Sequence, residues 1–259
     1  MTDPRRLVIE PSPRRVRVAF NGETVADSTA MRLLLEPDHL PVYYFPRADV
    51  RMDLLEATDH GSHCPHKGDA RYWTVVVGEQ RAENAAWSYD APIAAAADIT
   101  EYVAFYWDRM DHWHEEDEEI FVHPRDPYKR VDVVESRRPV RVVLGGETVA
   151  ETDYARFLFE TGLPTRYYIP RQDVRMDLLV PSETRTRCPY KGVAVYWSAR
   201  IGDRTYEDIV WSYPEPIAEC PRIRGYLCFF NEQVDEIFVD DISVPKVETK
   251  WSKTEPDSG

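Results

Sequence analysis

The sequence has few cysteines and no long apolar run, and these shortages exclude several classes of protein. No run of about 18 apolar residues is present to cross a membrane. Residues 1–15 lack the apolar core of a signal peptide. The cysteines form no Cys-x-x-Cys pair and no spacing typical of a disulfide framework, so we expect a cytoplasmic protein with reduced thiols. The four cysteines are Cys64, Cys188, Cys220 and Cys228.

Basic charge is also scarce relative to acidic charge. The chain has 32 Lys and Arg against 46 Asp and Glu, a net charge of -14. Because clustered basic side chains bind phosphate backbones by releasing counterions, this balance argues against nucleic acid as a partner. It also disfavours an anionic membrane surface. The apolar content of 43% and the aromatic content of 12% are typical of a folded globular protein.

The most informative feature is an internal repeat. A shift of 124 positions aligns Val16–Tyr106 with Val140–Phe230 without a gap, and 40 of the 91 positions are identical. After this block the pattern Glu-Ile-Phe-Val recurs at Glu119–Val122 and Glu236–Val239. Taken as equivalent, these patterns predict that the acidic segment Asp111–Glu119 is a solvated hairpin tip, shortened in the second copy.

The repeat predicts two tandem, mainly β domains of antiparallel strands, each with a short helix. We place a flexible N-terminus at 1–14, the first domain at 15–123, a linker at 124–138, the second domain at 139–243 and a flexible tail at 244–259. Short alternating segments with Gly and Pro turns indicate a small barrel-like or sandwich-like domain. We expect Val50–Leu55 to be a strand, residues 93–97 to be the helix, and Ile99–Trp107 with Ile120–His123 to form a closing hairpin.

Four motifs recur in order in both copies. In the first copy they are Val50-Arg-Met-Asp-Leu-Leu55, Cys64-Pro-x-Lys-Gly68, Tyr72-Trp73 and Trp87-Ser-Tyr89. Together they resemble the bacterial domain of unknown function family 427, present twice. This resemblance implies a β-tent fold, similar to that of methionine sulfoxide reductase B and the thalidomide-binding domain of cereblon. Many β-tent domains hold zinc with two Cys-x-x-Cys pairs, which both copies lack, so we expect no metal and no cofactor.

Polar and aromatic residues shared by the copies predict a ligand pocket in each. On a strand, Arg51 and Asp53 would share one face, and Lys67 follows on a constrained loop. Trp73, Trp87 and Tyr89 would supply aromatic walls. Such a pocket suits a small polar or anionic molecule. The second-copy counterparts are Arg175, Asp177, Lys191, Trp197, Trp211 and Tyr213. Ordinary structural roles remain open for all of them: a structural ion pair at a sheet edge, a solvated lysine and plain aromatic core.

Other functions are weighed against ligand binding. Cys64 and Cys188 are the only cysteines at aligned positions and allow a thiol-dependent enzyme, although no aligned histidine is available as a base. Nucleotidyl transfer, a label attached to the family, is disfavoured because neither copy shows a phosphate-binding glycine loop leading to an Asp-x-Asp strand. A protein-interaction scaffold is the third alternative. Potential metal ligands cluster in copy one at His60, His63, Cys64 and His66, but copy two keeps only the cysteine.

We expect a monomer whose copies form an intramolecular pseudo-dimer.

Overall fold

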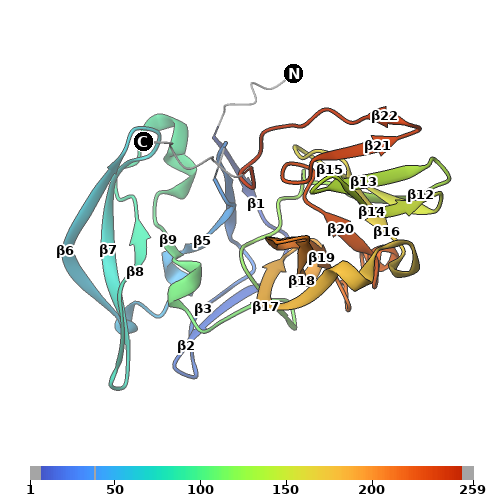
Figure 1. The fold of residues 1–259 in the computed structure, drawn as a ribbon. Coiled ribbons are helices and arrows are strands. Elements are labelled where there is room, and N and C mark those ends of the chain that lie inside the picture. The colour runs from blue at the N-terminus through green and yellow to red at the C-terminus, as the bar shows by residue number, and fades with distance from the viewer. Residues whose placement is uncertain (1–6, 38, 253–259) are drawn as a thin grey trace, which may run out of the picture. The chain divides into compact units, whose positions relative to one another are not determined.

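The computed structural model describes residues 7–37 and 39–252, and these are mainly β-strand (Figure 1). The chain divides into two compact units, residues 1–126 (unit 1) and 127–259 (unit 2). This division, the strand content and the antiparallel pairing agree with the prediction of two tandem β domains. Within the described residues, no helix is long and apolar enough to span a membrane.

Unit 1 contains a seven-stranded and a four-stranded antiparallel sheet. The larger sheet has the order β1-β4-β5-β9-β8-β7-β6 and the smaller one the order β11-β10-β2-β3. The strands are β1 (Val8–Pro11), β2 (Val16–Phe20), β3 (Glu23–Ser28), β4 (Arg32–Leu35), β5 (Val42–Pro46), β6 (Leu55–Cys64), β7 (Gly68–Val77), β8 (Gln80–Ser88), β9 (Tyr102–Phe105), β10 (His112–Glu115) and β11 (Glu118–Ile120).

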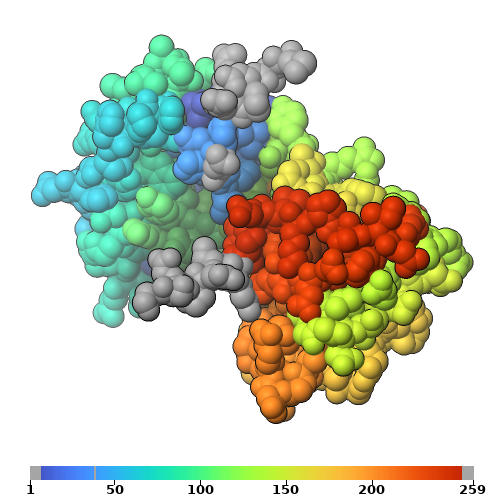
Figure 2. Space-filling model, turned by 45° about the horizontal axis from the view of Figure 1, so that its top comes forward, coloured from blue at the N-terminus to red at the C-terminus, as the bar shows by residue number. Residues whose placement is uncertain are grey.

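Unit 2 repeats this arrangement. Its larger sheet has the order β12-β15-β16-β20-β19-β18-β17 and its smaller sheet the order β14-β13-β21-β22. The strands from β20 onward are red in Figure 2, where they form much of the visible surface of this unit. The strands are β12 (Val131–Ser136), β13 (Val140–Leu144), β14 (Glu147–Thr152), β15 (Ala155–Glu160), β16 (Arg166–Ile169), β17 (Leu179–Cys188), β18 (Gly192–Ile201), β19 (Arg204–Ser212), β20 (Leu227–Phe229), β21 (Glu236–Val239) and β22 (Ile242–Ser243).

The central strands of each large sheet pack on both faces, because alternate side chains of a strand point to opposite sides. In β7, Trp73 packs in the core that includes the small sheet, with Val18 and Trp113. Its neighbour Tyr72 packs in a second core with Tyr44. Unit 2 has two matching cores, around Val142 and around Tyr168. The second core of unit 1 contributes Tyr44, Tyr72 and Tyr89 to the candidate site.

The predicted strand Val50–Leu55 is wrong. The chain here forms two 3-10 turns, η1 (Arg47–Asp49) and η2 (Met52–Leu54), and β6 begins only at Leu55. Val50 makes a single bridge to Ala26, and the amide of Met52 donates to the carbonyl of Val50 instead of to a neighbouring strand. The apolar residues at positions 50, 52 and 54 still pack against the core from this turn. Alternating apolar residues therefore do not require a strand here.

The predicted closing hairpin is also wrong. β9 pairs with β5 and β8, and it is β10 that pairs with β2. Val18 lies opposite Trp113, as its counterpart Val142 lies opposite Ile237, so the shift of 124 continues past the point where the sequence identity fades. The segment does form a hairpin, β10–β11, with an exposed turn at residues 116–117, but Trp113 is only 3% exposed, so the hairpin is not solvated throughout. The two Glu-Ile-Phe-Val patterns are not structurally equivalent.

Strands also occupy segments that were expected to be flexible. β1 lies within the predicted N-terminal tail and pairs with β4, and β12 lies within the predicted linker and pairs with β15. Both shield an edge of the large sheet, which explains why polar, proline-containing sequence is ordered there. Residues 1–6 and 253–259 of the predicted flexible ends lie outside the described residues. The expected short helix is a 3-10 segment, η3 (Ala94–Ile99), and unit 2 has η7 (Pro221–Ile223).

Candidate functional site

A cavity of about 430 Å³ lies in unit 1 beyond the point where β5 and β9 pair. Their pairing covers only Tyr44–Pro46 on β5. Val42 and Tyr43 before this pairing, and Tyr106 and Trp107 after β9, line the cavity. The volume falls within the ordinary range of small-molecule sites. The aromatic side chains in the lining are Tyr43, Tyr44, Tyr72, Trp87, Tyr89, Phe105, Tyr106, Trp107 and Trp113.

The strand register explains why these aromatic residues meet. Trp87 lies directly opposite Tyr72 across the β7–β8 pair, and residues opposite each other share a face of the sheet. Tyr89 follows two positions after Trp87 in the chain. The indole N–H of Trp87 donates to the hydroxyl of Tyr44 at 3.1 Å, and its ring centroid lies 4.5 Å from that of Tyr106. These contacts fix the orientation of Trp87, whose side chain stays partly exposed.

A buried ion pair contributes to the same lining. Lys67 Nζ lies 2.5 Å from Glu36 Oε2, and the two side chains are 10% and 11% exposed. The turn that carries Lys67 is held by its amide, which donates to the carbonyl of Cys64, and by its carbonyl, which accepts from Ile93. Because the two charges compensate each other, the pair leaves no unpaired cation for an anionic ligand.

Three tyrosines of the lining, Tyr44, Tyr89 and Tyr106, are neutral at physiological pH. Burial raises the pKa of Tyr44 and of Tyr89 well above the usual range. Burial and the neighbouring Tyr72 raise the pKa of Tyr106 to about 12. Their hydroxyl groups therefore act as donors and acceptors and carry no charge.

Two residues of this lining are in energetically unfavourable states. Within the described part of the chain, the buried indole N–H of Trp113 has no hydrogen-bond partner. Buried donors without a partner are rare and costly, so such an atom often marks a place for a polar group. Val122 has a φ of 81°, a conformation that strains a β-branched side chain. Both residues line the cavity, and the ring of Trp113 also packs in the core with Val18 and Trp73.

Unit 2 places an arginine where unit 1 has Val42. Arg166 lies opposite Leu158 on β15, as Val42 lies opposite Leu34 on β4. Its guanidinium group lies over Trp211, the counterpart of Trp87, with 5.6 Å from Cζ to the ring centroid. We infer that this group occupies the space on the tryptophan that stays open in unit 1. In agreement, Trp211 is only 7% exposed.

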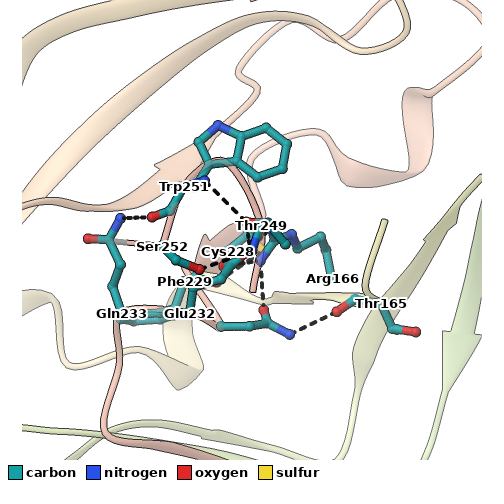
Figure 3. Close-up of polar contacts among 10 residues, drawn as sticks. Thr165, Arg166, Cys228, Phe229, Glu232, Gln233, Thr249, Trp251 and Ser252 are labelled. Carbon is teal, nitrogen blue, oxygen red and sulfur yellow. Dashed lines mark hydrogen bonds and ion pairs between the residues drawn. The ribbon is translucent and has the colours of Figure 1, made fainter. Parts of the chain in front are cut away.

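A polar network holds Arg166 in place (Figure 3). Its guanidinium group donates to both carboxylate oxygens of Glu232 at 2.6 and 2.7 Å and to Asn231 Oδ1 at 3.2 Å. Thr249 donates to the same carboxylate, and the ring of Trp251 lies 5.4 Å from Arg166 Cζ. Burial opposes ionisation of Glu232, but the hydrogen bonds from Arg166 and Thr249 prevail and lower its pKa. The C-terminal segment thus covers the arginine.

Three of the residues predicted from the sequence of unit 1 line the cavity: Lys67, Trp87 and Tyr89. Trp73 lies in the opposite core, with the guanidinium group of Arg47 5.2 Å from its ring. Its counterpart Trp197 packs in the corresponding core of unit 2, 5.9 Å from Arg171. The expectation that Trp73 forms an aromatic wall is corrected, since β7 presents Tyr72 to the cavity instead.

The predicted Arg–Asp face is also corrected. Arg51 and Asp53 form a two-bond ion pair with each other at 2.6 and 2.8 Å, with side chains 53% and 61% exposed, and neither lines the cavity. Arg175 and Asp177 form the same exposed pair in unit 2. Because these residues lie in a 3-10 turn, they do not share a strand face with other polar groups.

The second-copy counterparts of Lys67, Trp87 and Tyr89 lie at equivalent positions in unit 2. Lys191 forms a buried ion pair with Glu160, to which Lys129 adds a second cation at 3.1 Å. Burial opposes ionisation of Glu160, but the two lysines prevail and lower its pKa. Trp211 and Tyr213 lie in the second core of the unit.

The cysteines give little support to thiol chemistry. Cys64 and Cys188 pack at the edges of the second cores, and Cys64 is not in the cavity lining. Burial raises the pKa of Cys220 to about 11 and that of Cys228 to about 12, so these thiols stay protonated. His63 pairs with Asp69 at 2.6 Å. Over residues 7–37 and 39–252, no group of three or more metal-binding side chains is found.

Sequence reasoning missed several residues of the site. Tyr44 and Glu36 are identical in both copies, so the repeat itself could have revealed them. Arg166 was missed for the opposite reason, because it differs from Val42 and a search for shared residues passes over such positions.

Comparison with known proteins connects both units to one family. The model of the domain of unknown function 427 (DUF427) matches residues 8–116 and again residues 132–240. The curated proteins give no match to the chain. The two matched segments are offset by 124 residues, the same shift that relates the strands of the two units. The chain therefore belongs to the DUF427 family and carries two tandem copies of its domain.

Proposed function

We propose that unit 1 binds a small molecule in the aromatic cavity next to β5 and β9. The observation that carries this proposal is the partly exposed Trp87, held in place by Tyr44 and Tyr106 beside about 430 Å³ of open space. A preformed wall favours binding because little ordering entropy is lost when the ligand arrives. Burying a flat apolar face on such a wall contributes roughly 25 cal/mol per Å² before the cost of association.

The lining favours a polar ligand over an anionic one. The ammonium group of Lys67 is already paired with Glu36, and burial keeps the hydroxyl groups of Tyr44 and Tyr89 neutral. A polar group on the ligand can accept from the indole N–H of Trp113, which has no other partner in the described chain. The four free cysteines support a cytoplasmic location for this activity.

Thermal-shift screening of a metabolite library tests the proposal. A ligand at 100 times its dissociation constant stabilises the folded state by about 2.7 kcal/mol, which is readily measured. We expect hits with the wild-type chain and loss of those hits in Val42→Arg, which copies unit 2. The control is the double variant Arg51→Ala with Arg175→Ala, which removes exposed guanidinium groups outside the cavity. Hits that survive Val42→Arg but vanish in the control would place the site elsewhere.

A further inference from the structure

We propose that the ligand of unit 1 is an organic cation, a guanidinium or alkylammonium group stacked on Trp87. This inference rests on the proposed function and adds the chemical class of the ligand. Its basis is that unit 2 fills the corresponding space with a cation from its own chain, Arg166.

The two units present the same tryptophan in the same setting. The indole N–H of Trp87 donates to the hydroxyl of Tyr44, and that of Trp211 donates to the hydroxyl of Tyr168, both at 3.1 Å. The ring centroid of Tyr106 lies 4.5 Å from that of Trp87, and the ring centroid of Phe230 lies 4.5 Å from that of Trp211. One of the differences lies directly before the paired tyrosines of β5 and β16, where unit 1 has Val42 and unit 2 has Arg166. Arg166 therefore shows which chemical group this tryptophan accommodates.

The surroundings of Arg166 are those of a bound cation. Its guanidinium group lies near two indole rings, 5.6 Å from the centroid of Trp211 and 5.4 Å from that of Trp251. The side chain is only 7% exposed. Guanidinium is weakly hydrated for a cation and stacks on aromatic faces, so it loses little on burial there.

The charge of unit 1 favours a cation. Residues 1–126 contain 13 Lys and Arg against 24 Asp and Glu, a net charge of -11, whereas residues 127–259 contain 19 against 22, a net charge of -3. A field of this sign raises the local concentration of cations at a partly enclosed site. Lys67, a cation of the lining, is compensated by Glu36, and Arg109 lies over Tyr106 at 4.7 Å with its guanidinium group bonded to backbone carbonyls. Both of these cations are therefore already engaged.

Four probes of similar shape test the charge preference: phenethylguanidinium, phenethylammonium, phenethylurea and phenylpropionate. Binding is followed by tryptophan fluorescence and by calorimetry. We expect the guanidinium probe to bind at least about tenfold more tightly than the neutral urea, a difference within the range of cation–π contacts at partly desolvated sites. The affinity of the cations should fall as salt is raised, because salt screens the field of the acidic unit.

Two reciprocal variants locate the effect. In Val42→Arg, the cationic probes should lose their binding, whereas Val42→Leu should keep most of it. Arg166→Val removes the cation of unit 2, lowers the melting temperature, and should create a second site that guanidinium probes stabilise more than the urea. If Arg166→Val does not fold, the two Val42 variants carry the test alone.

The outcomes separate the two proposals. Equal binding of the urea and the guanidinium probe, or tighter binding of phenylpropionate, would overturn the cation inference while leaving the cavity as a binding site. Cation binding that persists unchanged in Val42→Arg would also overturn it, because the cation would then bind only to the acidic surface. If no probe binds and the metabolite screen also finds nothing, the proposed function itself fails.

Discussion

Exposed and buried ion pairs both occur in this protein, and burial decides how much each contributes to stability. Arg51 and Asp53 make two hydrogen-bonded contacts at 2.8 and 2.6 Å, but both side chains are more than half exposed. Water and salt screen such pairs, so they contribute little. Lys67 and Glu36 are about one tenth exposed, and removal of either partner leaves the charge of the other buried and unpaired in an apolar site.

The buried pair leads to a prediction on stability. Lys67→Met should lower the free energy of unfolding by about 3 kcal/mol, because the carboxylate of Glu36 loses its partner. The double variant with Glu36→Leu should recover much of this loss. Urea denaturation measures both, with Arg51→Ala as the control that leaves the midpoint nearly unchanged. A single variant as stable as the control would contradict the importance of burial.

Glu232 makes stability depend on pH. Its pKa is lowered in the folded protein from the usual 4.5, despite burial, by hydrogen bonds from Arg166 and Thr249. At pH values between the two pKa values the unfolded chain binds more protons, so this stabilisation is present above about pH 4.5 and is lost as the pH falls through the folded pKa. Glu232→Gln should therefore start less stable at pH 6 but lose less stability by pH 4. Parallel losses in denaturation curves would argue against this assignment.

At the residue scale, the sequence predicted Lys67, Trp87 and Tyr89 because duplication preserved them. It could not predict which face of the sheet each would occupy without the strand register. Trp73 illustrates this, since a shift of one position moves a side chain to the opposite core. Arg51 and Asp53 are equally well preserved, yet they lie on the surface.

At the scale of elements, the antiparallel strands around the hairpins were predictable and the irregular segments were not. The pattern of residues 50–55 alternates as in a strand, but the amide of Arg51 donates to the carbonyl of Val25 and the chain then turns. Long-range partners decide such a segment, and periodicity does not reveal them. Likewise, β10 was missed because Trp113 and Ile237 share no identity, although both fill the same core position.

The turn of the Cys-Pro-x-Lys-Gly motif requires its glycine. Gly192 has a φ of 111°, and a Cβ atom there would lie 3.1 Å from the carbonyl oxygen of Glu215. Gly192→Ala should therefore destabilise the protein by about 1–3 kcal/mol, the usual cost of such strain. Gly146→Ala is the matched control in the same unit, because its φ is also positive but no atom lies within 4 Å. Thermal melting should rank Gly192→Ala below Gly146→Ala, and the reverse order would count against the close contact.

At the scale of the whole molecule, each unit contains two cores and two sheets of its own. We therefore expect residues 1–126 and 127–259, produced as separate chains, each to fold and to melt cooperatively. Circular dichroism of the two fragments measures this. A fragment that shows no melting transition would mean that its fold depends on the rest of the chain.

If unit 1 binds its ligand as we propose, the duplication does not double the binding capacity, because Arg166 lies over the matching tryptophan of unit 2. With one half sealed by its own side chain, the stoichiometry should be one equivalent per polypeptide, and saturation should follow a simple hyperbola with a Hill coefficient of one. The sealed half then serves as an internal reference, whose melting is unchanged while that of the liganded half rises.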